Sequence, residues 1–332
     1  MAGRGTLGAL VTTDTRAWVE ALARVPDIVI DLDAPMARYT TMRVGGPADV
    51  LVTTASTAAA VAVARLAHQH HVPVTLLGGG SNVLVADAGI RGVVLRIHGG
   101  AVTAENADAV RADAGVTING LVRWLAGRGL AGLEAWAGTP GTVGGAIAGN
   151  AHFRQGLISE HVRSVRVLQP GGDVVDVSTA DMAFGYDRSR VQTSGEVVLS
   201  VSFAVRPGAA PDHLRSIARE SLAFRKRTQP LHRASAGCIF QNPGPEVPLP
   251  PGVPPSAGAL VDRAGLKGAR CGGAEVSTLH ANFIVVAPGS SASDVRALVD
   301  RCRAAVREGS DVGLIEEIVY LGDWPAAAES DR

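Results

Sequence analysis

Apolar residues recur along the chain in two rhythms, and each rhythm predicts a different kind of element. Spacings of three or four residues are typical of amphipathic helices, whereas short apolar runs are typical of strands. The predicted helices are 15–24, 57–70, 118–129, 212–228 and 293–308. The predicted strands are 49–53, 73–77, 93–97 and 196–205. In addition, 162–177 alternates apolar and polar residues around Gly171 and Gly172, a pattern that indicates a β-hairpin.

These elements group into three folded regions. Residues 37–97 mix strands and a helix and predict a compact α/β lobe, and 98–207 predict a second lobe. A linker containing Gly208 separates these lobes from a third domain at 212–322. The predicted N-terminal extension, 1–36, includes a turn at 31–35, and the polar segment 323–332 predicts a loose tail.

Composition narrows the class of protein. The 332 residues are 46% hydrophobic, carry no formal net charge and include 40 glycines, which is more than average. A neutral chain lacks the basic footprint of nucleic-acid binding. Three scattered cysteines predict neither a disulfide framework nor a zinc site. There is no clear signal peptide and no long apolar run, so we expect a cytoplasmic protein without a membrane span or a bound metal.

The segment 132–150 is rich in glycine, contains Pro140 and is nearly free of charge. Such a composition suits a loop whose backbone N–H groups approach an anion such as a pyrophosphate. The alternative is a glycine-rich surface loop. A second cluster at 77–82 directly follows a predicted strand and favours the anion-binding interpretation, although the GxGxxG dinucleotide motif is missing.

Eight motifs, which together extend over most of 38–322, resemble one enzyme family in their residues and their order. They are TMRVGGPA (41–48), LGGGSN (77–82), GTPGTVGGA (138–146), TQP (228–230), AGCIFQNP (236–243), AGALVD (257–262), HANF (280–283) and LIEEI (314–318). The chain resembles the UDP-N-acetylenolpyruvoylglucosamine reductases (UDP-N-acetylmuramate dehydrogenases), flavoenzymes of peptidoglycan precursor synthesis, and looks like a divergent member.

The resemblance implies an α+β fold, with a two-lobed FAD-binding module of the vanillyl-alcohol-oxidase type followed by a smaller α/β substrate-binding domain. It implies that NADPH donates a hydride through FAD to the enolpyruvyl ether of UDP-N-acetylglucosamine. We expect a monomer whose partners are small molecules. Two alternatives stay open: an FAD-dependent paralogue acting on another nucleotide sugar or alcohol, and a flavin or UDP-sugar binding protein without turnover.

The resemblance also implies catalytic residues. Cys238 stands where the family usually has a serine proton donor, and a thiol is the stronger acid. Glu317 matches the catalytic glutamate, with Glu316 where the family has proline. The alternatives are an inert buried cysteine and a solvated pair of glutamates.

In the family, an arginine contacts the substrate carboxylate, but this chain has no arginine at the matching position. The family reads Tyr-Arg-x-Ser, but here Asp187 takes the arginine place and is followed by Arg188 and Arg190. If the segment is extended, the two arginines share a face and Asp187 points away, which predicts that they act as a pair. Surface arginines paired with Asp187 are the alternative. The preceding loop also departs from the family, with His152 in a segment one residue longer that could contact flavin or substrate or only fill the loop.

The remaining expected site residues also follow from the motifs. For FAD they are Arg43, Gly45, Gly46, Leu77, Gly78, Gly79, Gly80, Ser81, Asn82, Gly138, Thr139, Pro140, Gly141, Thr142, Gly144, Gly145, Ala146 and Asn150. For the UDP-sugar they are Tyr186, Arg225, Lys226, Gln229, Asn242, His280 and Asn282. The basic run from Arg225 suits a diphosphate, although cations also favour a helix C-terminus.

Overall fold

The first lobe is a four-stranded sheet with helices on one face. The computed structural model describes residues 13–153 and 156–325. The strand order is β1-β2-β5-β3. The elements are α1 (Thr13–Leu22), β1 (Val29–Pro35), β2 (Pro47–Thr54), α2 (Thr57–Gln69), β3 (Val74–Leu77), β4 (Val83–Val85) and β5 (Ile90–Ile97). Ser56 caps α2 by accepting a hydrogen bond from the N–H of Ala59. The apolar side of α2, with Val63, packs against β5 residues such as Leu95 and confirms the predicted helix.

The expected extension 1–36 is too long, because β1 belongs to the sheet. Val29 and Ile30 pair with Thr53 and Val52 of β2 in an antiparallel ladder. The acidic residues Asp31 and Asp33 made this segment look like a turn, but they occupy exposed positions on an edge strand. Charged side chains are common at sheet edges, so they do not exclude a strand.

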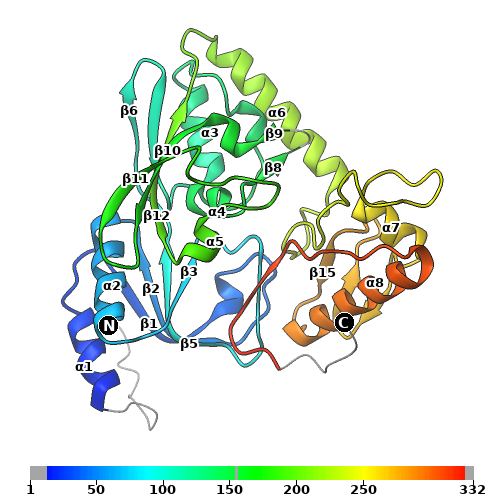
Figure 1. Cartoon of the computed structure of the whole chain (residues 1–332), viewed down its shortest axis with the longest axis horizontal. Coiled ribbons are helices and arrows are strands. Elements are labelled where there is room, and N and C mark those ends of the chain that lie inside the picture. The colour runs from blue at the N-terminus through cyan, green and yellow to red at the C-terminus, as the bar shows by residue number, and fades with distance from the viewer. Residues whose placement is uncertain (1–12, 154–155, 326–332) are drawn as a thin grey trace.

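The second lobe is a five-stranded antiparallel sheet, β11-β10-β12-β7-β6 (Figure 1). Its elements are β6 (Val102–Asn106), β7 (Ala109–Asp113), α3 (Ile118–Ala126), η2 (Glu134–Trp136), α4 (Val143–Ala148), β10 (Val162–Leu168), β11 (Val174–Ser178), α5 (Val191–Ser194) and β12 (Val197–Ala204). The antiparallel pairing of β10 with β11 confirms the predicted hairpin. Strand β12 is central and almost entirely buried, which explains why its sequence is mainly apolar apart from Ser200 and Ser202.

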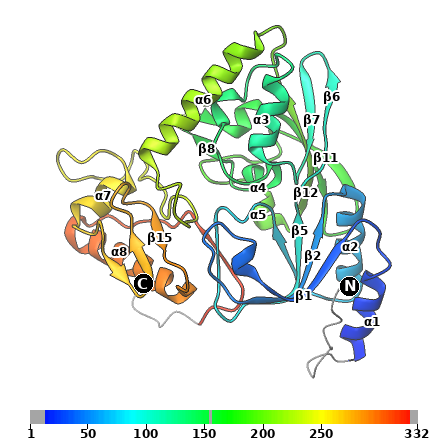
Figure 2. The same cartoon turned by 180° about the vertical axis from the view of Figure 1, so that it is seen from behind.

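The helix α6 (Pro211–Thr228) runs from the second lobe to the third domain, as both views show (Figures 1 and 2). That domain packs two helices against a three-stranded sheet. Its elements are α7 (Ala257–Arg263), β13 (Arg270–Cys271), β14 (Ala274–Val276), β15 (Ile284–Val286) and α8 (Ala292–Ser310). Its core includes Leu260, Val286 and Leu298, which join helices to sheet.

After α8 the chain returns to the first lobe. Strand β16 (Val319–Leu321) pairs in parallel with β4, and Val319 lies opposite Val83. A second contact holds the third domain against the first lobe, because Asp87 of the first lobe accepts hydrogen bonds at the N-terminus of α8. Its oxygens accept from the N–H of Ala292 at 2.7 Å and from the N–H and hydroxyl of Ser293 at 2.9 and 2.6 Å. The third domain is therefore tied to the first lobe at two points, although β16 and most of the loop contacts were not predicted.

The remaining short elements are η1 (Met36–Arg38), β8 (His152–Phe153), β9 (Gly156–Leu157) and η3 (Ile158–His161). Most of the predicted tail, 326–332, lies outside the described residues. Within the described part of the chain, no helix combines the length and the apolar character that crossing a bilayer requires.

Replacing Asp87, which links the first lobe to the N-terminus of α8, gives a first test of this architecture. Asp87→Ala removes three hydrogen bonds at the N-terminus of α8, so we expect a loss of about 1 kcal/mol in unfolding free energy. Urea denaturation followed by circular dichroism measures this change. The control is Asp212→Ala, which removes an exposed carboxylate from the first turn of α6, together with its ion pair to Arg215. Equal stability of the two variants would contradict the role of Asp87.

Candidate functional site

The two glycine-rich loops predicted from the sequence lie in direct contact. A Cβ atom on Gly79 would lie 2.6 Å from the Cα of Gly141, and one on Gly78 would lie 2.3 Å from the Thr142 hydroxyl. These glycines are needed because the loops pack backbone to backbone. Within the described residues, the N–H groups of Gly79, Gly80 and Ser81 donate no hydrogen bond, so they are free to bind an anion.

The second glycine loop keeps less of its backbone available. The N–H of Gly138 donates to Asn119, that of Gly144 to Ala114 and that of Gly145 to the Thr142 hydroxyl, which caps α4. Asn150 is fully buried, and its amide bonds Gly185 and Ser159. Several backbone N–H groups of 132–150 are therefore used in hydrogen bonds within the protein. Asn150 links the loop at Gly185 to the segment at Ser159.

Arg96 was missed by the sequence reasoning. It lies at the end of β5 opposite Leu77, directly before the first glycine loop. Its guanidinium stacks over the ring of Tyr39 with the carbon 5.4 Å from the ring centre, and its Nε is buried without a hydrogen-bond partner. A buried guanidinium N–H without an acceptor is suited to an anionic ligand. An arginine directly after the apolar run 93–95 is the sequence signal that could have revealed it.

The motif at 41–48 serves mainly to support β4. A Cβ on Gly45 would lie 2.6 Å from the Cβ of Val85, and one on Gly46 would lie 2.0 Å from the Asp87 carbonyl oxygen. Gly46 also donates a backbone hydrogen bond to Ala86. Arg43 is exposed and has a positive φ of 58°. The two glycines thus allow a close backbone approach.

Cys238 and Glu317 lie on neighbouring segments. The N–H of Glu317 donates to the carbonyl of Ile239 at 2.8 Å, and Phe240 pairs with Glu316 across an antiparallel bridge. The carbonyl of Glu317 accepts a hydrogen bond from the Asn82 side chain at 3.0 Å, which links it to the first glycine loop. The structure thus brings one predicted FAD residue, Asn82, and two of the four predicted catalytic residues, Cys238 and Glu317, to the same place.

The surroundings of the Cys238 thiol and the Glu317 carboxyl group keep both groups protonated. Burial, then the charges of Glu317 and Asp187, raises the pKa of the Cys238 thiol. Burial, then Asp187, raises the pKa of Glu317 to about 8, although His152 acts in the opposite direction. Both groups are therefore acids at neutral pH.

The adjacent glutamate is placed differently. Glu316 accepts a hydrogen bond from Arg303 at 2.8 Å and lies 3.8 Å from Arg296. It is engaged in an ion-pair network of the third domain. Of the two glutamates, only Glu317 lies with Cys238, and we call these two residues the Cys238 cluster.

The extended geometry expected for the arginine segment is wrong. The N–H groups of Gly185 and Arg188 each donate to the other residue's carbonyl, which makes a tight turn, and Asp187 has a φ of 50°. Its carboxylate points into the protein, where Oδ1 lies 2.9 Å from Nδ1 of His152. Arg188 is exposed, and Arg190 pairs with Glu196 at 2.6 Å, so the two do not converge on Cys238.

His152, Asp187 and Glu317 form a compact polar group. One nitrogen or oxygen atom from each side chain lies within 4.8 Å of the others. The Tyr186 hydroxyl extends this group, because it lies 3.5 Å from Nε2 of His152 and 3.5 Å from the amide nitrogen of Asn242. Burial raises the pKa of Tyr186 to about 12, so this hydroxyl is neutral.

Arg225 is the buried cation of the region. It donates to the Thr139 hydroxyl at 2.8 Å, and its guanidinium carbon lies 3.8 Å from the ring centre of Phe153. Burial lowers the pKa of Arg225 to about 10, which leaves it protonated at neutral pH. Lys226, the next residue of the basic run, is exposed instead.

Other predicted substrate residues support the loop that carries Cys238. The side chain of Asn282 donates to the Phe240 carbonyl at 2.7 Å and accepts from its N–H at 2.9 Å. His280 accepts a hydrogen bond from the N–H of Asn282 at 3.3 Å. Gln229 is partly buried and caps α6 through its N–H. Asn282 therefore uses its amide groups to hold the Cys238 segment in place.

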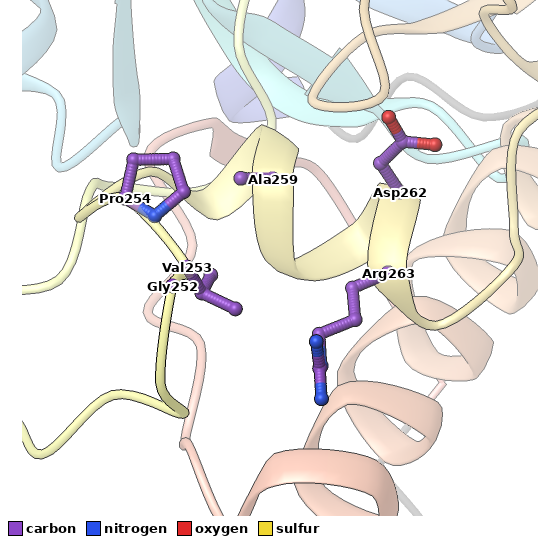
Figure 3. A pocket seen from close by; sticks show the side chains of 6 residues that line it. All are labelled: Gly252, Val253, Pro254, Ala259, Asp262 and Arg263. Carbon is purple, nitrogen blue, oxygen red and sulfur yellow. The ribbon is translucent and has the colours of Figure 1, made fainter.

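A cavity of about 410 Å³ lies on the third domain (Figure 3). Its wall combines the loop before α7 with one side of that helix. The lining residues are Gly252, Val253, Pro254, Ala259, Asp262 and Arg263. None of them belongs to a glycine loop or to the Cys238 cluster, so this cavity is a separate feature.

Two family models match the chain: the UDP-N-acetylenolpyruvoylglucosamine reductase C-terminal domain over residues 229–321, and an FAD binding domain over 48–178. A relative named UDP-N-acetylenolpyruvoylglucosamine reductase from Anaeromyxobacter sp. (strain Fw109-5) is 40% identical, and the match covers 97% of each chain. One from Parasynechococcus marenigrum (strain WH8102) is 40% identical over 88% of this chain and 96% of the relative.

Among solved structures, the UDP-N-acetylenolpyruvylglucosamine reductase (MurB) of Thermus caldophilus is 33% identical with a TM-score of 0.71, covering 89% of this chain and 98% of that one. These matches confirm the expected α+β fold, an FAD-binding module followed by a C-terminal domain. The chain therefore belongs to the UDP-N-acetylenolpyruvoylglucosamine reductase family of FAD-dependent oxidoreductases.

Proposed function

We propose that the protein uses NADPH and FAD to reduce the enolpyruvyl ether of UDP-N-acetylglucosamine to UDP-N-acetylmuramate, a precursor of peptidoglycan. The observation that carries this proposal is the meeting of two protonated acids, Cys238 and Glu317, beside the first glycine loop. Family membership supports the choice of substrate.

The chain fits FAD at the paired glycine loops. The free N–H groups of Gly79, Gly80 and Ser81 suit a pyrophosphate, and the orphaned Nε of Arg96 offers a further donor. Gly141 and Thr142 would complete this site from the second loop. Bound FAD supplies the hydride-transfer chemistry, while the protein orients the cofactor and substrate.

The acids act on the substrate. Reduction of an enolpyruvyl alkene adds a hydride at one carbon and a proton at the next, so the site needs a proton donor. Cys238 takes this role, because its thiol is held in its protonated form. Glu317, neutral below about pH 8, donates a hydrogen bond that stabilises negative charge developing next to the substrate carboxylate.

The experiment is to purify the protein, record its visible spectrum for flavin and follow NADPH consumption with and without the enolpyruvyl UDP-sugar. Substrate-dependent oxidation of NADPH with formation of UDP-N-acetylmuramate is expected. Absence of flavin after addition of FAD would refute the proposal. Oxygen reduction independent of the sugar would favour an oxidase instead.

Gly79→Ala tests the paired loops. Its Cβ would lie 2.6 Å from Gly141, so the loops must separate, and we expect FAD to bind at least about tenfold more weakly. Quenching of flavin fluorescence measures the dissociation constant. Gly171→Ala is the matched control, because no atom lies within 4 Å of the added Cβ. Unchanged affinity in Gly79→Ala would remove these loops from the FAD site.

Substitution of Cys238 tests the proton donor. Cys238→Ser replaces the thiol with a hydroxyl, which is still a proton donor, and is expected to retain activity, whereas Cys238→Ala is expected to lose about 100-fold or more in kcat. NADPH oxidation with the enolpyruvyl sugar measures both. Cys271→Ala, at another partly exposed free cysteine, serves as the control. Equal turnover by the serine and alanine variants would contradict a donor role.

Glu317→Gln tests the raised pKa. Glutamate has a pKa of 4.5 when unperturbed and about 8 in the folded protein, so unfolding releases a proton between these values. The stability that protonation of Glu317 contributes is fully present below pH 4.5 and is lost as the pH rises to about 8. The wild type should therefore lose stability relative to Glu317→Gln across this range, as measured by urea unfolding at pH 5 and pH 8. A constant difference between the proteins would show that Glu317 is ionised.

A further inference from the structure

The polar group around His152 contains two carboxyl groups and one imidazole in a largely buried place. The Asp187 side chain is only 8% exposed, and its Oδ1 lies 2.9 Å from Nδ1 of His152. Its other oxygen, Oδ2, is buried without a hydrogen-bond partner. A buried aspartate is costly unless a cation neutralises it, so the contact with His152 favours an imidazolium.

The other cations near this group are engaged or exposed. Arg190 is paired with Glu196, and Arg188 is exposed on the turn. Arg225 donates to Thr139 and stacks on Phe153. Among the described residues, His152 is thus the cation in contact with the carboxyl cluster that contains Glu317.

The orientation of the His152 ring leaves its Nε2–H group available to a ligand. Nδ1 bonds Asp187, and Nε2 has only a long 3.5 Å contact with the Tyr186 hydroxyl. A carboxylate oxygen can replace this weak contact with a short, charge-assisted hydrogen bond. We propose that the imidazolium of His152 binds the carboxylate of the enolpyruvyl substrate through Nε2, and that Asp187 is the positioning residue that holds the ring. This inference rests on the proposed function.

The charges that face His152 come from several segments. Asp187 and Tyr186 belong to the tight turn, Glu317 precedes β16, and Arg225 lies on α6. The hydrogen bond that Nδ1–H of His152 donates to Asp187 is the main cause that raises the pKa of His152, while burial and Arg225 oppose it. The cation is present below this raised pKa, and carboxylate binding is lost as the pH rises through it.

Two probes separate recognition of the carboxylate from a structural role. Calorimetric titration of the FAD-loaded protein at pH 6.5 uses UDP-N-acetylmuramate, which has the carboxylate, and UDP-N-acetylglucosamine, which lacks it. His152→Gln is expected to weaken binding of the first at least about tenfold and leave the second unchanged. His161→Gln, at another partly buried histidine, should leave both unchanged. Equal weakening of both probes, or of neither, by His152→Gln would overturn the proposal.

Asp187→Asn tests the positioning role independently. The His152 proton signal, identified by its loss in His152→Gln, should titrate above pH 6.5 in the wild type and at lower pH in Asp187→Asn. The pH above which UDP-N-acetylmuramate binding weakens should move down with it. An unchanged titration would refute the role of Asp187. Activity abolished by EDTA and restored by a divalent cation would also overturn the proposal, because a metal would then hold the cluster.

Failure of the proposed function gives a different result. The wild type would then not reduce the enolpyruvyl substrate, whether or not it binds a UDP-sugar. If the wild type reduces it and His152→Gln binds UDP-N-acetylmuramate equally well, only the inference about His152 fails.

Discussion

The return of the chain from the third domain to the first lobe is the constraint on which the site depends. Pairing of β16 with β4 fixes the segment that carries Glu317, and the Asn82 side chain holds its carbonyl. On its other side, Glu317 bonds the backbone of Ile239 next to Cys238. One short segment therefore aligns the glycine loop, the thiol and the carboxyl group, which come from distant parts of the sequence.

This arrangement also determines the charge of the site. Enclosure between two domains removes water from Glu317 and Cys238, and Asp187 adds a negative charge beside them, so both keep their protons. Asp187 itself remains tolerable there because His152 is in contact with it. Loss of either partner of this pair would change the proton affinity of the whole cluster, since its members lie within a few ångströms of one another.

Local patterns were sufficient to predict much of the framework. The helices α2, α6 and α8, the β10–β11 hairpin and the two glycine loops could be predicted because periodicity and turn residues act over short distances. Strand β1 was missed because acidic residues are tolerated at a sheet edge. The turn at Asp187 was missed because a positive φ in a residue other than glycine depends on surrounding contacts, here those of Asn150 and Ser189.

Two segments depart from the family pattern: the loop that contains His152 and the turn that contains Asp187. They form one structural unit. Asn150 bonds the Gly185 carbonyl, and Ser189 bonds the Ala148 carbonyl, so the end of α4 and the turn are held together from both sides. Between these two links His152 meets Asp187. A change in either segment alone would leave a buried carboxylate without its cation or an imidazole without its acceptor. The physical cost of such a half-changed state explains why both departures occur in the same chain.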